Sequence, residues 1–66
     1  MISDLDIWRT AGMLIREHGE YADLEAAISA DEMLDRRDVD GHILWMRVLN
    51  AIDDLRRAEP GDDTVH

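Results

Sequence analysis

The segment DVDGH, residues 38–42, is where metal or catalytic chemistry would first be sought in this 66-residue chain. Asp38 and Asp40 have the spacing of the first two ligands of an EF-hand calcium loop, which also needs glycine at position six and a bidentate Glu at position twelve. Here glycine stands at position four and Leu49 at position twelve. We therefore interpret the segment as a helix start, with Asp38 as N-cap and Asp40 in the first turn.

The other residues of this segment have structural roles in the same interpretation. Gly41 leaves room for a neighbouring side chain or backbone, and His42 is expected to project outward near the helix N-terminus. The remaining imidazoles, His18 and His66, lie near a helix end and at the chain end, and no pair has the HxxxH or HExxH spacing of a zinc site. The chain has no cysteine, which excludes thiolate ligands. We expect no metal site and no cofactor.

Neither acid–base nor nucleophilic catalysis is indicated by the other polar residues. Acid–base catalysis needs carboxylates held in an apolar cleft, whereas Asp31, Glu32 and Asp35 lie among polar neighbours. The hydroxyl side chains also lack a neighbouring base that could activate them. These hydroxyls belong to Ser3, Thr10, Ser29 and Thr64. We expect a protein that is not an enzyme.

Three helices must position these side chains, and their expected ranges are 4–18, 21–36 and 39–58. Ser3 is the N-cap candidate of the first helix, with Asp6 at the N3 position of a variant capping box. Because the helices are amphipathic and their connections short, the sequence predicts an all-α fold, a small three-helix bundle.

Breaker residues set the limits of the helices. Gly19 can take a left-handed conformation after the first helix without steric cost. Pro60 and Gly61 follow the third helix and begin a segment with adjacent acids and one sizeable apolar residue. The sequence therefore predicts a helical domain of residues 1–58 and a disordered acidic tail of residues 59–66.

Apolar residues at helical spacing identify the faces expected to pack in the core. The core stripe expected on the first helix consists of Leu5, Trp8, Ala11, Gly12 and Ile15. The stripe on the third helix consists of Leu44, Trp45, Val48, Leu49, Ile52 and Leu55. The residues expected to supply core and interface contacts are Trp8, Trp45, Ile52 and Leu55. Because so short a chain cannot bury every apolar residue, Ile7, Leu14 and Met46 are candidates for an outer face.

The second helix carries two apolar rows. Its larger residues recur at helical spacing and are Tyr21, Leu24, Ala27, Ile28 and Met33 or Leu34. Its small residues Ala22, Ala26 and Ala30 are spaced four apart, which lets another helix approach closely. We interpret the alanine row as a packing ridge.

The chain is strongly acidic, with a net charge of −9 and with arginine as its only strongly basic residue. Residues 20–40 hold eight acids against two arginines, net −6, whereas residues 41–58 sum to +1. Direct binding of nucleic acid or of an anionic membrane is therefore not expected, because both reward basic patches.

The acids of the second helix form a candidate interaction surface. They are Glu20, Asp23, Glu25, Asp31, Glu32 and Asp35. Three interpretations stay open: a solvated face that keeps the protein soluble, a docking surface for a basic protein partner, or a mimic of nucleic-acid phosphates that inhibits a basic protein such as a phage-defence factor. The leading prediction is a non-enzymatic protein–protein interaction or regulatory module.

Self-association and a cytoplasmic location are further expectations. A chain of this length has a marginal core, and small domains of this kind often gain stability from a second subunit, so a homodimer is predicted. The N-terminal sequence MISDLDIWRT lacks the basic and apolar regions of a signal peptide. No apolar run approaches the roughly 20 residues that span a bilayer. The default compartment is the cytoplasm.

The stretch HGEYADLEAAISADEMLDRRDVDGHILWMRVLNAIDDL contains a spaced pattern: His-Gly, Ala, Ala-Asp-x-x-Leu, Asp-x-x-Gly-x-x-x-Trp and Ile-x-x-Leu. In this pattern the chain resembles a group of short uncharacterised bacterial all-helical proteins, over residues 5–55. Members of that group tend to have Gly where Arg37 stands here. The resemblance implies a helical fold and no particular activity.

Overall fold

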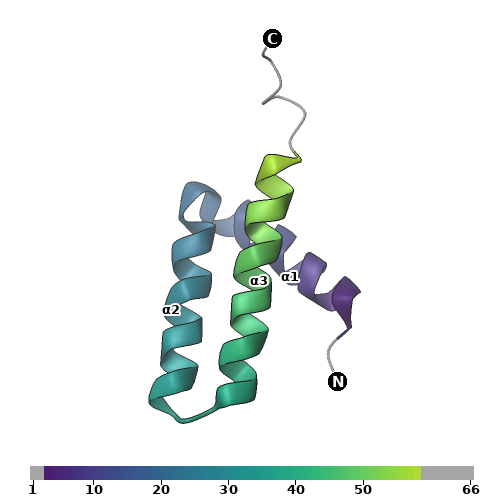
Figure 1. Ribbon diagram of the computed structural model, residues 1–66. Coiled ribbons are helices and arrows are strands. Elements are labelled where there is room, and N and C mark those ends of the chain that lie inside the picture. Colours follow the sequence, from purple (N-terminus) through teal and green to yellow (C-terminus); the bar gives the residue numbers. More distant parts are fainter. Residues whose placement is uncertain (1–2, 59–66) are drawn as a thin grey trace.

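The computed structural model describes residues 3–58, and all the regular structure in this range is helical. Helix α1 spans Asp4–His18 and is followed by a 3₁₀ turn, η1, at Gly19–Tyr21. Helices α2 and α3 span Ala22–Asp35 and Val39–Arg57 (Figure 1). The all-α class is confirmed for this range, and the helix ends lie within one residue of the expected positions. The predicted tail lies outside the described residues.

The arrangement differs from the expected three-helix bundle. Two helices, α2 and α3, pair side by side as an antiparallel hairpin, and α1 crosses behind one end of it (Figure 1). Arg47 of α3 contacts Asp4 at the start of α1, and Arg56 contacts Gly19 just after its end. Helix α1 therefore covers the C-terminal half of α3 and leaves the N-terminal half beyond its reach.

Local hydrogen bonds fix both ends of α1. Ser3 Oγ accepts a hydrogen bond from the Asp6 backbone N–H at 3.2 Å, and the Ser3 hydroxyl donates to the Asp6 carboxylate at 3.1 Å. At the other end, Gly19 has a φ of 58° and its N–H donates to the Ile15 carbonyl. These contacts match the predicted N-cap and the predicted glycine terminator.

The turn between α2 and α3 is a Schellman motif with arginine at the position that favours glycine. The Asp38 N–H donates to the Met33 carbonyl at 2.8 Å, and the Arg37 N–H donates to the Leu34 carbonyl at 2.9 Å. Arg37 has a φ of 61° and is the one non-glycine residue with positive φ among residues 3–58. A side chain in this conformation is strained.

The segment 38–42 is the start of α3, as predicted. The Asp38 carboxylate accepts a hydrogen bond from the Gly41 N–H at 2.9 Å, which uses it as an N-cap. A Cβ atom on Gly41 would lie 2.8 Å from Met33 Sδ, so this glycine lets α2 approach. The expectation for His42 was wrong: its Nδ1 lies 3.0 Å from the Ala30 carbonyl oxygen, which can only accept, so the half-buried ring binds α2.

The core is built from small residues and a few branched ones. Its buried members are Ile7, Ala11, Leu14, Ala22, Ala26, Ala30, Val48, Ala51 and Ile52. The alanine row of α2 is thus a packing ridge, as predicted. Val48 and Ile52 supply the largest fully buried side chains, and the rest of the expected α3 stripe is half-buried against them.

The expected core face of α1 was only partly right: Ala11 is buried and Ile15 is half-buried against the core, as predicted. Ile7 and Leu14, expected on an outer face, are buried, whereas Leu5 and Trp8 from the expected core stripe are exposed. The two rows are neighbours on one broad apolar face. Because α1 lies across the junction of α2 and α3, the row of Ile7, Ala11 and Leu14 enters the core. The expected outer position of Met46 agrees with its exposure.

Candidate functional site

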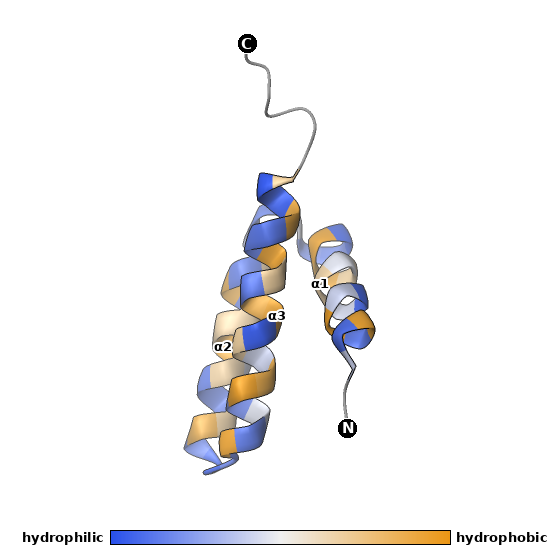
Figure 2. Ribbon diagram, turned by 45° about the vertical axis from the view of Figure 1, so that its right-hand side comes forward, coloured by the Kyte–Doolittle hydropathy of each residue, from blue (hydrophilic) through white to orange (hydrophobic). Residues whose placement is uncertain are grey.

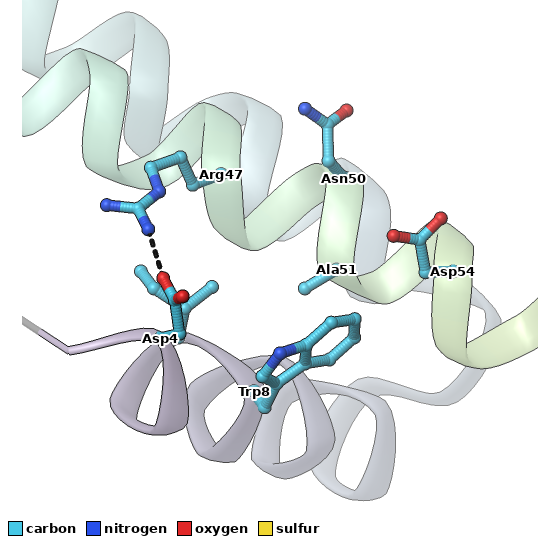
Figure 3. Close-up of a pocket in the computed structure, with 7 residues that line it drawn as sticks. Asp4, Trp8, Arg47, Asn50, Ala51 and Asp54 are labelled. Carbon is cyan, nitrogen blue, oxygen red and sulfur yellow. Dashed lines mark hydrogen bonds and ion pairs between the residues drawn. The ribbon is translucent and has the colours of Figure 1, made fainter.

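A shallow pocket lies between α1 and α3, with a volume of about 290 Å³. Trp8 lies across from Ala51, and the guanidinium of Arg47 reaches from α3 to the carboxylate of Asp4 (Figure 3). Ile7, Asn50 and Asp54 complete its lining. The volume is at the lower limit of small-molecule sites, and Trp8 stays 40% exposed.

The charged groups around this pocket already bind one another. Arg47 pairs with Asp4, and Asp54 accepts a hydrogen bond from Arg57 at 2.7 Å. A second hollow of about 220 Å³ between α2 and α3 includes Asp23 and Arg56, which lie 3.6 Å apart. These pairs hold helices together or lie within one helix. Neither hollow contains a nucleophile beside a general base.

The most distinctive surface is a row of large apolar residues that begins in η1 and continues on the outer face of α2. Tyr21, Leu24 and Ile28 are 61%, 53% and 43% exposed. Leu24 and Ile28 each lie two residues from the buried Ala26, which is about 200° around an α-helix. The row, here called the α2 stripe, therefore faces away from the core.

Carboxylates surround the α2 stripe. Glu25 follows Tyr21 by four residues and precedes Ile28 by three, while Asp31 and Glu32 follow Ile28 by three and four. Residues at these spacings are neighbours on a helix surface. Asp31 and Glu32 are exposed and Glu25 is half-buried. The residues of α2, Ala22–Asp35, include no Arg, Lys or His, so all the charged side chains of the helix itself are acidic. The nearest basic residue along the chain is Arg36, the C-cap residue, four residues after Glu32.

A second apolar row, here called the α3 stripe, lies on the half of α3 that α1 leaves uncovered. It consists of Val39, Ile43 and Met46, spaced four and three apart and all exposed. Figure 2 shows hydrophobic residues on the part of the hairpin that extends past α1. Its charged surroundings are mixed, with Asp40 and Arg47 on the same helix and both exposed. This row differs from the α2 stripe in having both signs of charge nearby.

The six predicted interaction acids differ in their contacts. Glu20, Asp31, Glu32 and Asp35 are exposed without an ion pair among the contacts within residues 3–58. Asp23 instead pairs with Arg56 and accepts a hydrogen bond from the Leu24 N–H at 2.9 Å. Asp23 therefore has a structural contact that distinguishes it from the other acids.

The four predicted core and interface residues differ in burial. Ile52 is fully buried, Trp45 and Leu55 are half-buried against the core, and Trp8 is exposed in the pocket. Sequence reasoning did not identify the α2 stripe as a solvent-facing row. The signal was present: a helix with separate alanine and large apolar rows can bury only one of them deeply, and the alanine row permits the closer approach.

No protein-family model, curated protein or solved structure matches the chain. The resemblance to short bacterial helical proteins stays a prediction. Within residues 3–58, no three His, Asp or Glu side chains gather in a way that could hold a metal ion. None of the helices described is both long and apolar enough to cross a bilayer.

Proposed function

We propose that this protein is a non-enzymatic protein–protein interaction module that forms a homodimer and binds a further protein. The observation that carries the proposal is the presence of two apolar stripes on helix faces directed away from the core. Exposed apolar rows of this kind are typical of surfaces that bind other proteins. The charged groups of the two hollows are already paired, which adds no support for catalysis.

The α3 stripe is the proposed dimer surface. Ile43 and Met46 are exposed residues of the N-terminal half of α3, and the hairpin extends past α1 at that end (Figure 1), so a second copy can approach both side chains. Of the exposed charges near this stripe, Asp40 is acidic and Arg47 is basic, with Arg47 already paired to Asp4. A symmetric pair of copies would therefore bring few like charges together. A twofold dimer formed through the α2 stripe would instead bring the acidic residues of α2 close to the same residues of the second copy.

Light scattering coupled to size exclusion tests the dimer. We expect a mass of twice 7.6 kDa at high micromolar concentration, and a monomer for the double variant Ile43→Ser/Met46→Ser. Leu5→Ser is the control, because Leu5 is an exposed leucine on α1 that belongs to neither stripe. A monomeric wild-type protein, or a dimer that survives the double substitution, contradicts the proposed surface.

A nucleic-acid mimic is the second candidate function. It is favoured by the exposure of Asp31, Glu32 and Asp35 on a helix without basic residues. Against it, the α2 stripe places apolar side chains between the carboxylates, whereas a phosphate backbone is a continuous row of charge. The test is joint neutralisation of Asp23, Glu25, Asp31, Glu32 and Asp35. Unchanged salt dependence of partner binding in that variant rules out the mimic.

A further inference from the structure

We infer that the α2 stripe binds an amphipathic helix whose apolar anchors are flanked by arginine or lysine. This inference rests on the proposed interaction function and names the class of partner. The anchors of such a partner recur at three- and four-residue spacing, as Tyr21, Leu24 and Ile28 do on this chain. Two helices with complementary rows can pack along their lengths.

Exposure and shape support the apolar part of the contact. The stripe runs from the end of η1 through the first two turns of α2, and α2 is held against α3 through its alanine row on the opposite side. In the N-terminal half of α2, where the stripe lies, Ala22 and Ala26 are fully buried and Asp23 lies 3.6 Å from Arg56 of α3. The stripe is therefore presented on a fixed helix, which lowers the entropy lost on binding.

Charge complementarity identifies the flanks of the partner. Glu25 and Glu32 lie on one side of the stripe and Asp31 on the other, and none of the three has an ion-pair partner among the contacts of residues 3–58. A cation placed beside Ile28 meets Glu25 and Glu32 on one side and Asp31 on the other. Basic flanks would gain attraction on approach, and acidic flanks would be repelled.

The same charges disfavour other occupants. A second copy of this chain, aligned through its own α2 stripe, would bring these carboxylates close to identical ones. Nucleic acid and anionic lipid would be repelled as well. A basic amphipathic helix is the occupant that suits both the apolar row and its acidic borders.

Fluorescence anisotropy with designed peptides tests this inference on the full chain. The probe is a labelled peptide of about 16 residues with leucines at helical spacing and arginines on both flanks. Two matched peptides replace the arginines with glutamates or the leucines with serines. We expect only the first peptide to bind. Its affinity should be at least about tenfold lower at 0.5 M than at 0.05 M salt, because salt screens the electrostatic attraction.

Paired variants locate the contact. Leu24→Ser/Ile28→Ser and, separately, Asp31→Asn/Glu32→Gln are each expected to weaken binding about tenfold. Asp53→Asn/Asp54→Asn changes the net charge by the same amount on α3 and is expected to leave the affinity within about twofold. Circular dichroism melts show whether each variant is folded. Where a variant does not fold, the serine and glutamate peptides test the same contacts on the wild-type protein.

The outcomes separate this inference from the proposed function. Binding of the glutamate peptide, or equal loss with the α3 control pair, overturns the inference. If the Leu24→Ser/Ile28→Ser variant binds the arginine peptide as tightly as the wild type does, charge alone attracts the peptide, and this result also overturns the inference. Absence of peptide binding together with an intact dimer rejects the basic-helix partner and leaves the α3 surface standing. A monomer that still binds the arginine peptide rejects the dimer and supports this inference.

Discussion

The Arg56 guanidinium donates a hydrogen bond to the Gly19 carbonyl oxygen, 2.7 Å away, and so joins the end of α3 to the connection between α1 and α2. Gly19 lies at the end of α1, where carbonyl groups lack partners within the helix. The same guanidinium lies 3.6 Å from the Asp23 carboxylate. One side chain therefore contacts the α1–α2 connection and the first turn of α2.

Arg56→Ala is expected to lower the free energy of unfolding by about 1 kcal/mol, because it removes a charge-assisted hydrogen bond that joins distant segments. Urea denaturation followed by circular dichroism measures the change. Arg57→Ala is the control, since its partners Asp53 and Asp54 lie on the same helix. It is expected to lower the free energy by no more than about 0.5 kcal/mol, and an equal effect of both substitutions would contradict the role of Arg56.

Arg37→Gly is expected to stabilise the protein by about 0.5–1 kcal/mol. Arg37 has a φ of 61°, which a residue with a Cβ adopts at a steric cost and glycine adopts freely. Arg36→Gly is the matched substitution one residue earlier, where φ is −90°, and it should destabilise. Thermal melts of both variants check the prediction, which fails if Arg37→Gly melts at a lower temperature than the wild type.

Asp38→Ala is expected to lower stability by about 0.5–2 kcal/mol because the Gly41 N–H loses its acceptor. Asp38→Asn should retain most of the stability, since asparagine caps a helix about as well as aspartate. Chelator should leave the melts of all three proteins unchanged. Stabilisation by added calcium or zinc would instead show that this carboxylate binds a metal.

Gly41→Ala and Gly12→Ala are expected to act in opposite directions. A Cβ at residue 41 would lie 2.7 Å from the Asp38 carboxylate and 2.8 Å from Met33 Sδ, so crowding should destabilise by about 1–3 kcal/mol. A Cβ at residue 12 meets nothing within 4 Å. Alanine there should stabilise α1 by about 0.5–1 kcal/mol through its higher helix propensity. Chemical denaturation compares the two, and a stabilising Gly41→Ala would contradict the close approach of α2.

The helix limits were predictable because their signals are local. Ser3, Gly19 and Asp38 each act within a few residues of themselves, and each makes the expected contact. The direction of His42 was not predictable, because it depends on how closely α2 approaches. The alanine row sets that distance, and its effect on the ring of another helix is visible only in the assembled hairpin.

The core face of α1 shows the same limit. The rows that contain Ile7 and Leu5 are both apolar and lie next to each other, so helical spacing does not decide which row is buried. The choice depends on where α1 crosses the hairpin, and that crossing is set by contacts far apart in the sequence, such as Asp4 with Arg47. The candidate acids were identifiable from composition, but the α2 stripe between them needed the burial of the alanines to be recognised.

Helix α1 covers only part of the hairpin, so backbone amides in the covered and uncovered parts should exchange with solvent deuterium at different rates. Val48 and Ile52 of α3 lie in the core where all three helices meet, so the amides around them should exchange only when the whole domain unfolds. Those in the last turn of α2 and the first turns of α3 lie at the hairpin end that extends past α1 (Figure 1), where two helices can separate without disturbing the third. Exchange there should proceed through local opening at a lower free energy, making this end the first to fluctuate in the native protein.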